Sequence, residues 1–122
     1  MAHRSRIGGF SIDCQTDDLS AAAAFWGKVL GVGPEPAEEN YMRLGHQGGL
    51  SVEVQKVDHP SRVHLDIETD DIEAEVARLV ELGAKRFRDM EDWVVMEAPT
   101  GHRFCVVPAH GADFEREATT WE

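Results

Sequence analysis

The chain has 122 residues, of which 42% are hydrophobic, and its 23 acidic and 12 basic residues give a formal net charge of −11. This length and composition suit one globular domain, and no apolar run is long enough to cross a bilayer. The negative charge repels phosphate groups, so we expect neither a nucleic-acid partner nor a membrane partner, whereas a cationic small molecule would be attracted.

The N-terminal sequence MAHRSRIGGF lacks the apolar core and the cleavage site of a secretory signal, which predicts a cytoplasmic protein. The chain has two cysteines, Cys14 and Cys105. Such a low number indicates reduced thiols rather than a disulfide framework.

The first predicted strand lies in FSIDC, residues 10–14, where apolar residues recur at every second position. That period is typical of a strand with one buried face. The sequence TDD at 16–18 predicts a helix start, because Asp and Thr oxygens accept hydrogen bonds from the unpaired first amides. Apolar residues at helical spacing then predict a helix that ends at Gly31, a suitable left-handed cap.

Two further strands are predicted near 40–44 and 50–57, with HQGG as the turn between them. A short edge strand fits into VGPEPAE, although proline weakens that pattern. These elements form a first module of about residues 7–57, in the order strand, helix, strand, strand, strand.

The segment HLDIETDDIEAEVARL (64–79) repeats SIDCQTDDLSAAAAFW (11–26). The identical pairs are Asp13/Asp66, Thr16/Thr69, Asp17/Asp70, Asp18/Asp71, Ala21/Ala74 and Ala24/Ala77. A fainter match continues downstream and pairs Tyr41 with Trp93. The sequence therefore predicts that the first module is duplicated.

The second module spans about residues 62–108. Its helix is expected to begin at Asp70, with Glu73 in the capping-box position, and to end at Gly83. An edge strand is predicted in KRFRD, and the last two strands near 93–97 and 103–108. The remaining residues, 109–122, read as a polar tail that could be a frayed helix or a dimer arm.

Alternation along each strand predicts which side chains share a face. The apolar residues of the fifth strand, Val63, Leu65 and Ile67, are expected in the core. The polar positions that face away from the helices are Ser11, Asp13, Glu53, Gln55, His64, Asp66 and Cys105. If both sheets curl the same way, these positions line one concave surface.

The pattern H-x-D-x-x-x-D-D, an amphipathic helix, LGA and a later P-x-G turn before the final strand resemble the vicinal oxygen chelate superfamily. This superfamily is also called the glyoxalase, bleomycin resistance and extradiol dioxygenase group. The similarity covers about residues 7–108 and is strongest to the glyoxalase-like branch. It implies an α+β fold in a single glyoxalase-like domain, with two tandem βαβββ modules forming a U-shaped curved sheet, helices outside, and a homodimer.

The resemblance also implies metal ligands at positions 11, 53, 64 and 105, where metal-dependent members place His or Gln, Glu, His and Glu. This chain has Ser11, Glu53, His64 and Cys105 there. A serine hydroxyl is a poor ligand for a divalent cation, so we predict no metal site and no cofactor. An alignment slip of two residues would replace Glu53 by Gln55.

Three functions remain open from the sequence. The first is a metal-free binding protein, like antibiotic-sequestering members of the superfamily, that holds a cationic organic molecule. The expected ligand-binding residues are Ser11, Asp13, Tyr41, Gln55, Asp66, Trp93 and Cys105, and Val95 would add an apolar wall.

The second function is a lyase, isomerase or dioxygenase, metal-dependent or metal-free, with His64 and Glu53 as catalytic residues. The third is purely structural, with His64 and Asp66 hydrogen-bonded inside a cavity that has lost its ligand.

Overall fold

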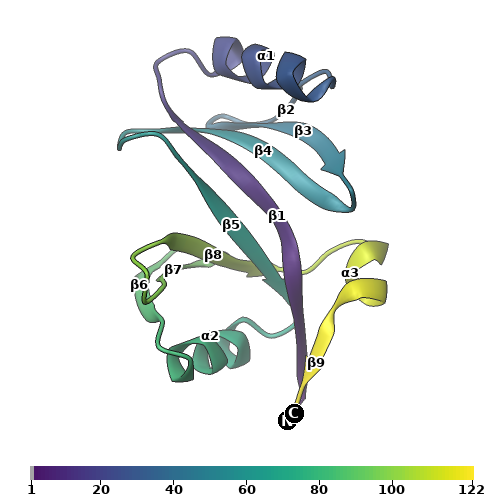
Figure 1. Cartoon of the computed structure of the whole chain (residues 1–122), viewed down its shortest axis with the longest axis vertical. Coiled ribbons are helices and arrows are strands. Elements are labelled where there is room, and N and C mark those ends of the chain that lie inside the picture. Colours follow the sequence, from purple (N-terminus) through teal and green to yellow (C-terminus); the bar gives the residue numbers. More distant parts are fainter. Residues whose placement is uncertain (1) are drawn as a thin grey trace. The chain divides into compact units, whose positions relative to one another are not determined.

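The computed structural model in Figure 1 describes residues 2–122. The chain divides into two compact units. The first-module unit is Gly9–His64, and the second-module unit combines the residues up to Gly8 with Leu65–Glu122. The boundaries fall within strands β1 (His3–Gln15) and β5 (Arg62–Thr69). No helix within residues 2–122 is long and apolar enough to span a membrane.

The first-module unit has the predicted order of elements. After β1 come α1 (Leu19–Leu30), β2 (Glu35–Glu38), β3 (Tyr41–Gln47) and β4 (Leu50–Val57). Strand β3 is antiparallel to β2 and β4, and β4 is parallel to β1. Gly48 and Gly49 form the β3–β4 turn with φ angles of 60° and 83°, which side chains disfavour.

The second-module unit repeats this order. After β5 come α2 (Ile72–Glu81), β6 (Lys85–Asp89), β7 (Val94–Glu97) and β8 (Arg103–Pro108). Strand β8 is parallel to β5 and antiparallel to β7, and β7 is antiparallel to β6. The predicted α+β fold of two tandem βαβββ modules is therefore confirmed.

The repeated TDD sequence makes the same hydrogen bonds in both modules. Asp18 accepts from the amide of Ala21 at 3.0 Å, and Asp71 accepts from Ala74 at 3.0 Å. The prediction that Asp70 caps α2 is wrong, because its carboxylate accepts instead from the Arg4 amide at 2.9 Å. The cap moves one residue along, which leaves Glu73 outside the capping-box position.

Each module has its own hydrophobic core. Ile12, Leu44, Val52 and Val54 pack with Ala23 of α1 in one. In the other, the core residues are Val76, Ala84, Val94, Met96 and Val106.

The prediction of buried Val63 and Leu65 on β5 is wrong, because these side chains are 58% and 46% exposed. Helix α2 makes its main sheet contacts with β6 and β8 rather than with β5. Alternation in β5 therefore separates two faces but does not show which of them is covered.

The expected polar tail contains helix α3 (Ala112–Glu117) and strand β9 (Thr119–Trp121). Strand β9 pairs antiparallel with the start of β1, and His3 lies opposite Trp121. The two ends of the chain are therefore part of the sheet of the second-module unit.

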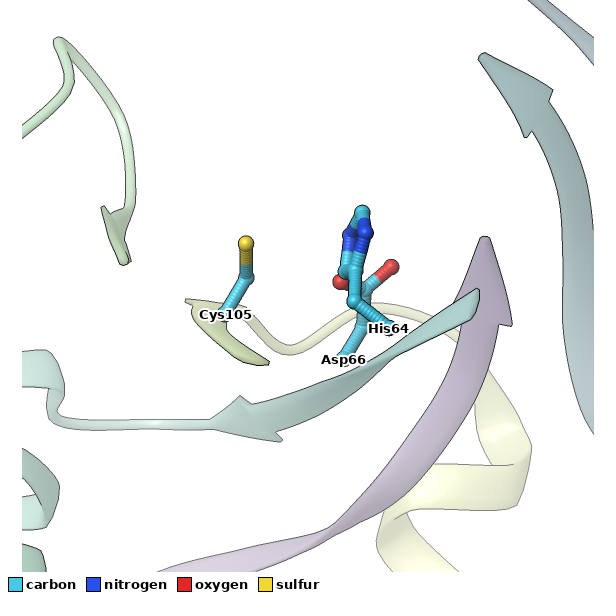
Figure 2. A group of neighbouring side chains, drawn as sticks. All are labelled: His64, Asp66 and Cys105. Carbon is cyan, nitrogen blue, oxygen red and sulfur yellow. The ribbon is translucent and has the colours of Figure 1, made fainter. Parts of the chain in front are cut away.

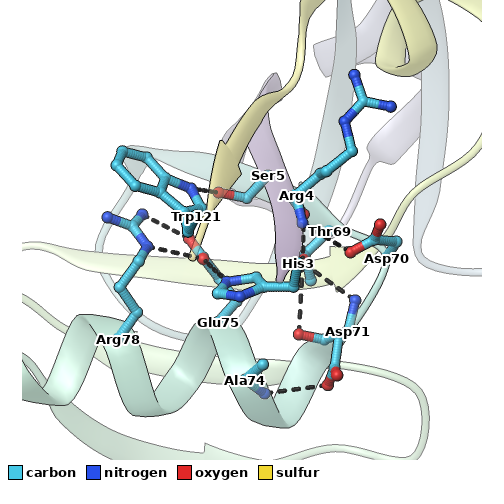
Figure 3. A network of polar contacts seen from close by, with 10 residues as sticks. All are labelled: His3, Arg4, Ser5, Thr69, Asp70, Asp71, Ala74, Glu75, Arg78 and Trp121. Carbon is cyan, nitrogen blue, oxygen red and sulfur yellow. Dashed lines mark hydrogen bonds and ion pairs between the residues drawn. The ribbon is translucent and has the colours of Figure 1, made fainter. Parts of the chain in front are cut away.

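A buried carboxylate connects both ends of the chain to α2 (Figure 3). Glu75 accepts hydrogen bonds from Arg78 at 2.9 and 2.8 Å, and its Oε1 lies 2.7 Å from His3 Nε2. The Arg78 guanidinium stacks 3.9 Å from the Trp121 ring centroid, and Trp121 donates to Ser5 at 2.9 Å. Burial raises the pKa of Glu75, but hydrogen bonds from Arg78, His3 and Ser5 outweigh it and lower the pKa.

Candidate functional site

The polar positions predicted in the first module come together on the face of the sheet that points away from α1. Two rungs cross the strands β1, β4 and β3: Ser11, Glu53 and Arg43 form one, and Asp13, Gln55 and Tyr41 form the next. Register partners on neighbouring strands project to the same side of a sheet. The predicted residues of this module thus share one surface, to which Arg43 adds a cation.

Asp13 is the centre of this surface, although it is almost fully buried, with 2% exposure. Ser11 Oγ donates to Asp13 Oδ1 at 3.0 Å. The Nδ1 atom of His64 lies 2.6 Å from Asp13 Oδ2, and the Arg62 guanidinium lies 3.8 Å from the same oxygen. A hydroxyl, an imidazole and a guanidinium therefore surround one carboxylate, as the cost of burying a charge requires.

This arrangement fixes the orientation of the His64 ring. A carboxylate can only accept hydrogen bonds. Nδ1 of His64 must therefore carry the proton and donate the hydrogen bond to Asp13. In the neutral ring the lone pair then belongs to Nε2. That atom can accept a hydrogen bond, take a proton or bind a metal.

The sequence did not single out Arg62 and Arg43. Both occupy positions of the polar alternation, so that pattern was the available signal. Their approach to Asp13 and Glu53 follows from pairing between distant strands.

In the second-module unit, one rung contains Asp66 of β5, Cys105 of β8 and Val95 of β7. Figure 2 shows Asp66 and Cys105 on their neighbouring strands, and an oxygen of Asp66 lies within 4.8 Å of Cys105 Sγ. Trp93 is not part of this rung. It lies before β7, where its carbonyl accepts from the Met90 amide at 2.9 Å.

Glu68 is a second buried carboxylate, at the next position of the polar face of β5. The basic side chains of Arg6 and His110 lie 3.7 and 3.8 Å from its carboxylate oxygens. Burial raises the pKa of Glu68, and Arg6 and His110 offset part of that increase. A side chain at Gly8 would place its Cβ 2.8 Å from Glu68 Cδ, so glycine makes room for the carboxylate.

Positions 53 and 105, which the resemblance implies as ligands from the last strand of each module, are not matching positions in the strand pairing. Asp13 and Asp66 are matching positions of the repeat, and their register partners are Gln55 and Cys105. Cys105 therefore corresponds to Gln55, which is the slip of two residues considered above. The sequence repeat is clearest in the first strand and the helix of each module. It does not determine the register of the last strand of each module.

Two of the four positions that the resemblance implies carry other residues than those of metal-dependent members, a serine at 11 and a cysteine at 105. Ser11 is a neutral hydroxyl that already donates to Asp13. We therefore derive no chemical step through a metal.

Comparison with protein families finds one match over most of the chain. Residues 10–107 match the model of a glyoxalase-like domain. No curated protein matches the chain.

Three solved structures share the fold at low sequence identity. A protein described as an NAD-dependent benzaldehyde dehydrogenase from Legionella pneumophila has a TM-score of 0.63 and 10% identity, over 83% of this chain and 99% of its own. A methylmalonyl-CoA epimerase has a TM-score of 0.58 and 16% identity, over 86% of this chain and 95% of its own. The Mn(II)-bound glyoxalase from Novosphingobium aromaticivorans has a TM-score of 0.53 and 18% identity, over 88% of this chain and 43% of its own.

Proposed function

The chain belongs to the glyoxalase-like domain family of the vicinal oxygen chelate superfamily, and we propose that it binds a small organic molecule at Asp13 and His64 without a complete metal site. One observation carries the proposal. Ser11, Asp13 and His64 form a continuous hydrogen-bonded chain in which a buried carboxylate orients the imidazole. The hydroxyl stands at the position where metal-dependent members have their first ligand.

The chemistry of this chain indicates the class of ligand. Nε2 of His64 accepts a hydrogen bond when Nδ1 donates to Asp13, so a ligand hydroxyl or N–H group suits it. Glu53 on the neighbouring rung adds a carboxylate, and the net charge of −11 attracts cations. Tyr41 supplies an aromatic side chain in the same rung as Asp13, on the other side of Gln55. An amine that also carries a hydroxyl group satisfies all of these groups.

The same pair supports a second candidate function, a metal-free lyase or isomerase. A carboxylate that holds Nδ1 of an imidazole leaves Nε2 placed to remove a proton from a bound substrate. Positioned proton transfer of this kind contributes about 10²–10⁴-fold to a rate. His64 would be the base, and Asp13 would stabilise the imidazolium that forms.

A thermal-shift screen tests the binding proposal. We would compare hydroxyl-bearing amines with acids of matched shape, on protein purified without a histidine tag. The amines are expected to raise Tm for the wild type and for His46→Ala, an exposed control in the same module, but not for His64→Ala.

Two results would contradict this function. One is a preference for the acids. The other is a stoichiometric metal, found by elemental analysis of the wild type and lost in His64→Ala, because the imidazole would then be a ligand.

A further inference from the structure

The candidate site contains two positive charges that an amine ligand does not use. Arg62 and Arg43 are exposed residues of the first-module unit, and each is a neighbour of one carboxylate. Arg62 Nε lies 3.8 Å from Asp13 Oδ2. Arg43 is the register partner of Glu53. The ligand should therefore match charges of both signs, because like charges repel at short range.

A neighbouring histidine holds Arg62 in place. The Nη2 atom of Arg62 lies 3.3 Å from His59 Nε2. A guanidinium can only donate hydrogen bonds, so His59 Nε2 is the acceptor and the proton of the neutral ring is on Nδ1. That Nδ1 atom lies 2.9 Å from the Pro60 carbonyl, to which it donates. The two contacts of His59 thus fix the direction of the Arg62 side chain.

Arg62 keeps hydrogen-bond donors for a ligand. Its side chain is 41% exposed, and its distance to Asp13 is longer than a hydrogen bond. Among residues 2–122, the contact with His59 is the one hydrogen bond described for this guanidinium. A guanidinium has five N–H groups in a planar fork that matches the geometry of a carboxylate. The remaining N–H groups of Arg62 therefore suit a carboxylate of a bound molecule.

One small molecule can reach both Arg62 and His64. The Nδ1 atom of His64 and the Nε atom of Arg62 lie 2.6 and 3.8 Å from the same oxygen of Asp13, so they are at most about 6.4 Å apart. His64 Nε2 is the other nitrogen of the same five-membered ring. A molecule with a few bonds between its hydroxyl and carboxylate groups therefore spans the two side chains.

We propose that the ligand of this site is a zwitterion, a hydroxyl-bearing amino acid whose carboxylate binds Arg62. This rests on the proposed function, in which the hydroxyl donates to His64 Nε2 and the amine pairs with Glu53. The carboxylate completes the match of charges. A monoanion fits better than a phosphate dianion, because the carboxylates of Asp13 and Glu53 repel further negative charge.

Calorimetric titration with matched pairs of compounds tests the proposal. The pairs are isoserine with its amide, and γ-amino-β-hydroxybutyric acid with its amide. Each amide keeps the charged amine, the hydroxyl and the shape of the acid but lacks the negative charge. The wild type should bind the acid about tenfold more tightly than the amide, on the scale of one charge-assisted hydrogen bond.

Variants of Arg62 assign this preference to its side chain. Arg62→Gln should bind acid and amide about equally. Arg62→Lys should regain part of the preference, since it keeps the charge without the planar fork. Lys56→Gln is the matched control, because Lys56 is an exposed cation on the opposite face of β4 from Gln55, and it should keep the wild-type preference. Circular dichroism would confirm that the variants are folded.

The outcomes separate this proposal from the proposed function. Equal affinity of the wild type for acid and amide, or a preference for the amide, overturns the proposal but leaves an amine site at His64 intact. A preference for the acid that survives in Arg62→Gln overturns the assignment to Arg62. No binding of either compound of both pairs up to about 10 mM overturns the proposed function, and this proposal with it.

Discussion

The two modules share their scaffold but differ in what they place on it. Thr16 and Asp18 in the first module make the same cap contacts as Thr69 and Asp71 in the second. The polar faces have diverged, since Ser11 corresponds to His64 in the repeat, and Gln55 corresponds to Cys105 in the strand pairing. The local signals that start a helix are thus preserved where the side chains available for binding are not.

The helices differ in the same way. The solvent face of α1 is apolar around Phe25, whereas α2 carries acidic and basic residues and buries a glutamate beneath them. The second module places its buried charge in a structural network, and the first module places Asp13 beside the imidazole of its candidate site. The following predictions test this division of roles.

Removing the charge of Glu75 should have the largest effect. Glu75→Gln leaves Arg78 and His3 without their shared carboxylate in a buried position. Loss of one partner of a buried pair costs about 3–5 kcal/mol, so we expect a decrease near the lower value in the free energy of unfolding. Urea denaturation would measure it. Glu73→Gln, on the exposed side of α2, should change little, and an equal loss there would contradict the account.

The contribution of Glu75 should also depend on pH in a defined direction. Its pKa in the folded chain lies below the ordinary value of 4.5. The stabilisation is therefore present above that value and is lost as the pH falls through the lower folded pKa. Unfolding experiments between neutral and strongly acidic pH should show the wild type and Glu75→Gln converging below 4.5. A difference that stays constant would exclude this linkage.

The Asp13–His64 pair should control binding more than folding. Asp13→Asn keeps the shape of the side chain but offers His64 Nδ1 a weaker, uncharged acceptor. We expect about a tenfold to hundredfold loss in affinity for an amine identified by the screen, on the scale of one charge-assisted hydrogen bond. Calorimetric titration would measure it. Asp66→Asn, at the matching position of the repeat, should retain more of the affinity.

The helix caps should give the smallest effects and should be equal. Asp18→Ala and Asp71→Ala each remove one hydrogen bond to a first-turn amide. Each should decrease the free energy of unfolding by about 1 kcal/mol. A loss at one cap several times larger than at the other would show that the modules differ in their scaffold as well as in their surfaces.

Local signals in the sequence predicted most of the fold. The repeated TDD, the alternating strands and the glycines at 31, 48, 49 and 83 gave the order of both modules. The mistakes concern contacts between distant segments. Asp70 does not cap α2, because its carboxylate accepts a hydrogen bond from the Arg4 amide. Val63 and Leu65 are exposed, because α2 packs mainly on β6 and β8. Strand β9 depends on pairing with the start of β1.

The candidate site was predicted in part. Alternation placed Ser11, Asp13 and Glu53 on one face, and the strand register brings them together. The contact between Asp13 and His64 joins residues 51 positions apart, so no local pattern could give it. Glu68 follows Asp66 on the same face of β5, but its surroundings include Arg6 and His110 from distant parts of the sequence, which alternation does not predict.

The ¹⁵N NMR signals of the His64 imidazole provide the most direct measurement, because the ligand site depends on which ring nitrogen carries the proton. In the neutral ring of protein treated with a chelator, Nδ1 should be protonated and Nε2 should show the shift of an unprotonated acceptor. Addition of a bound amine should then perturb Nε2. A proton on Nε2 instead, or an Nε2 signal in untreated protein that changes when a metal is removed, would contradict the account.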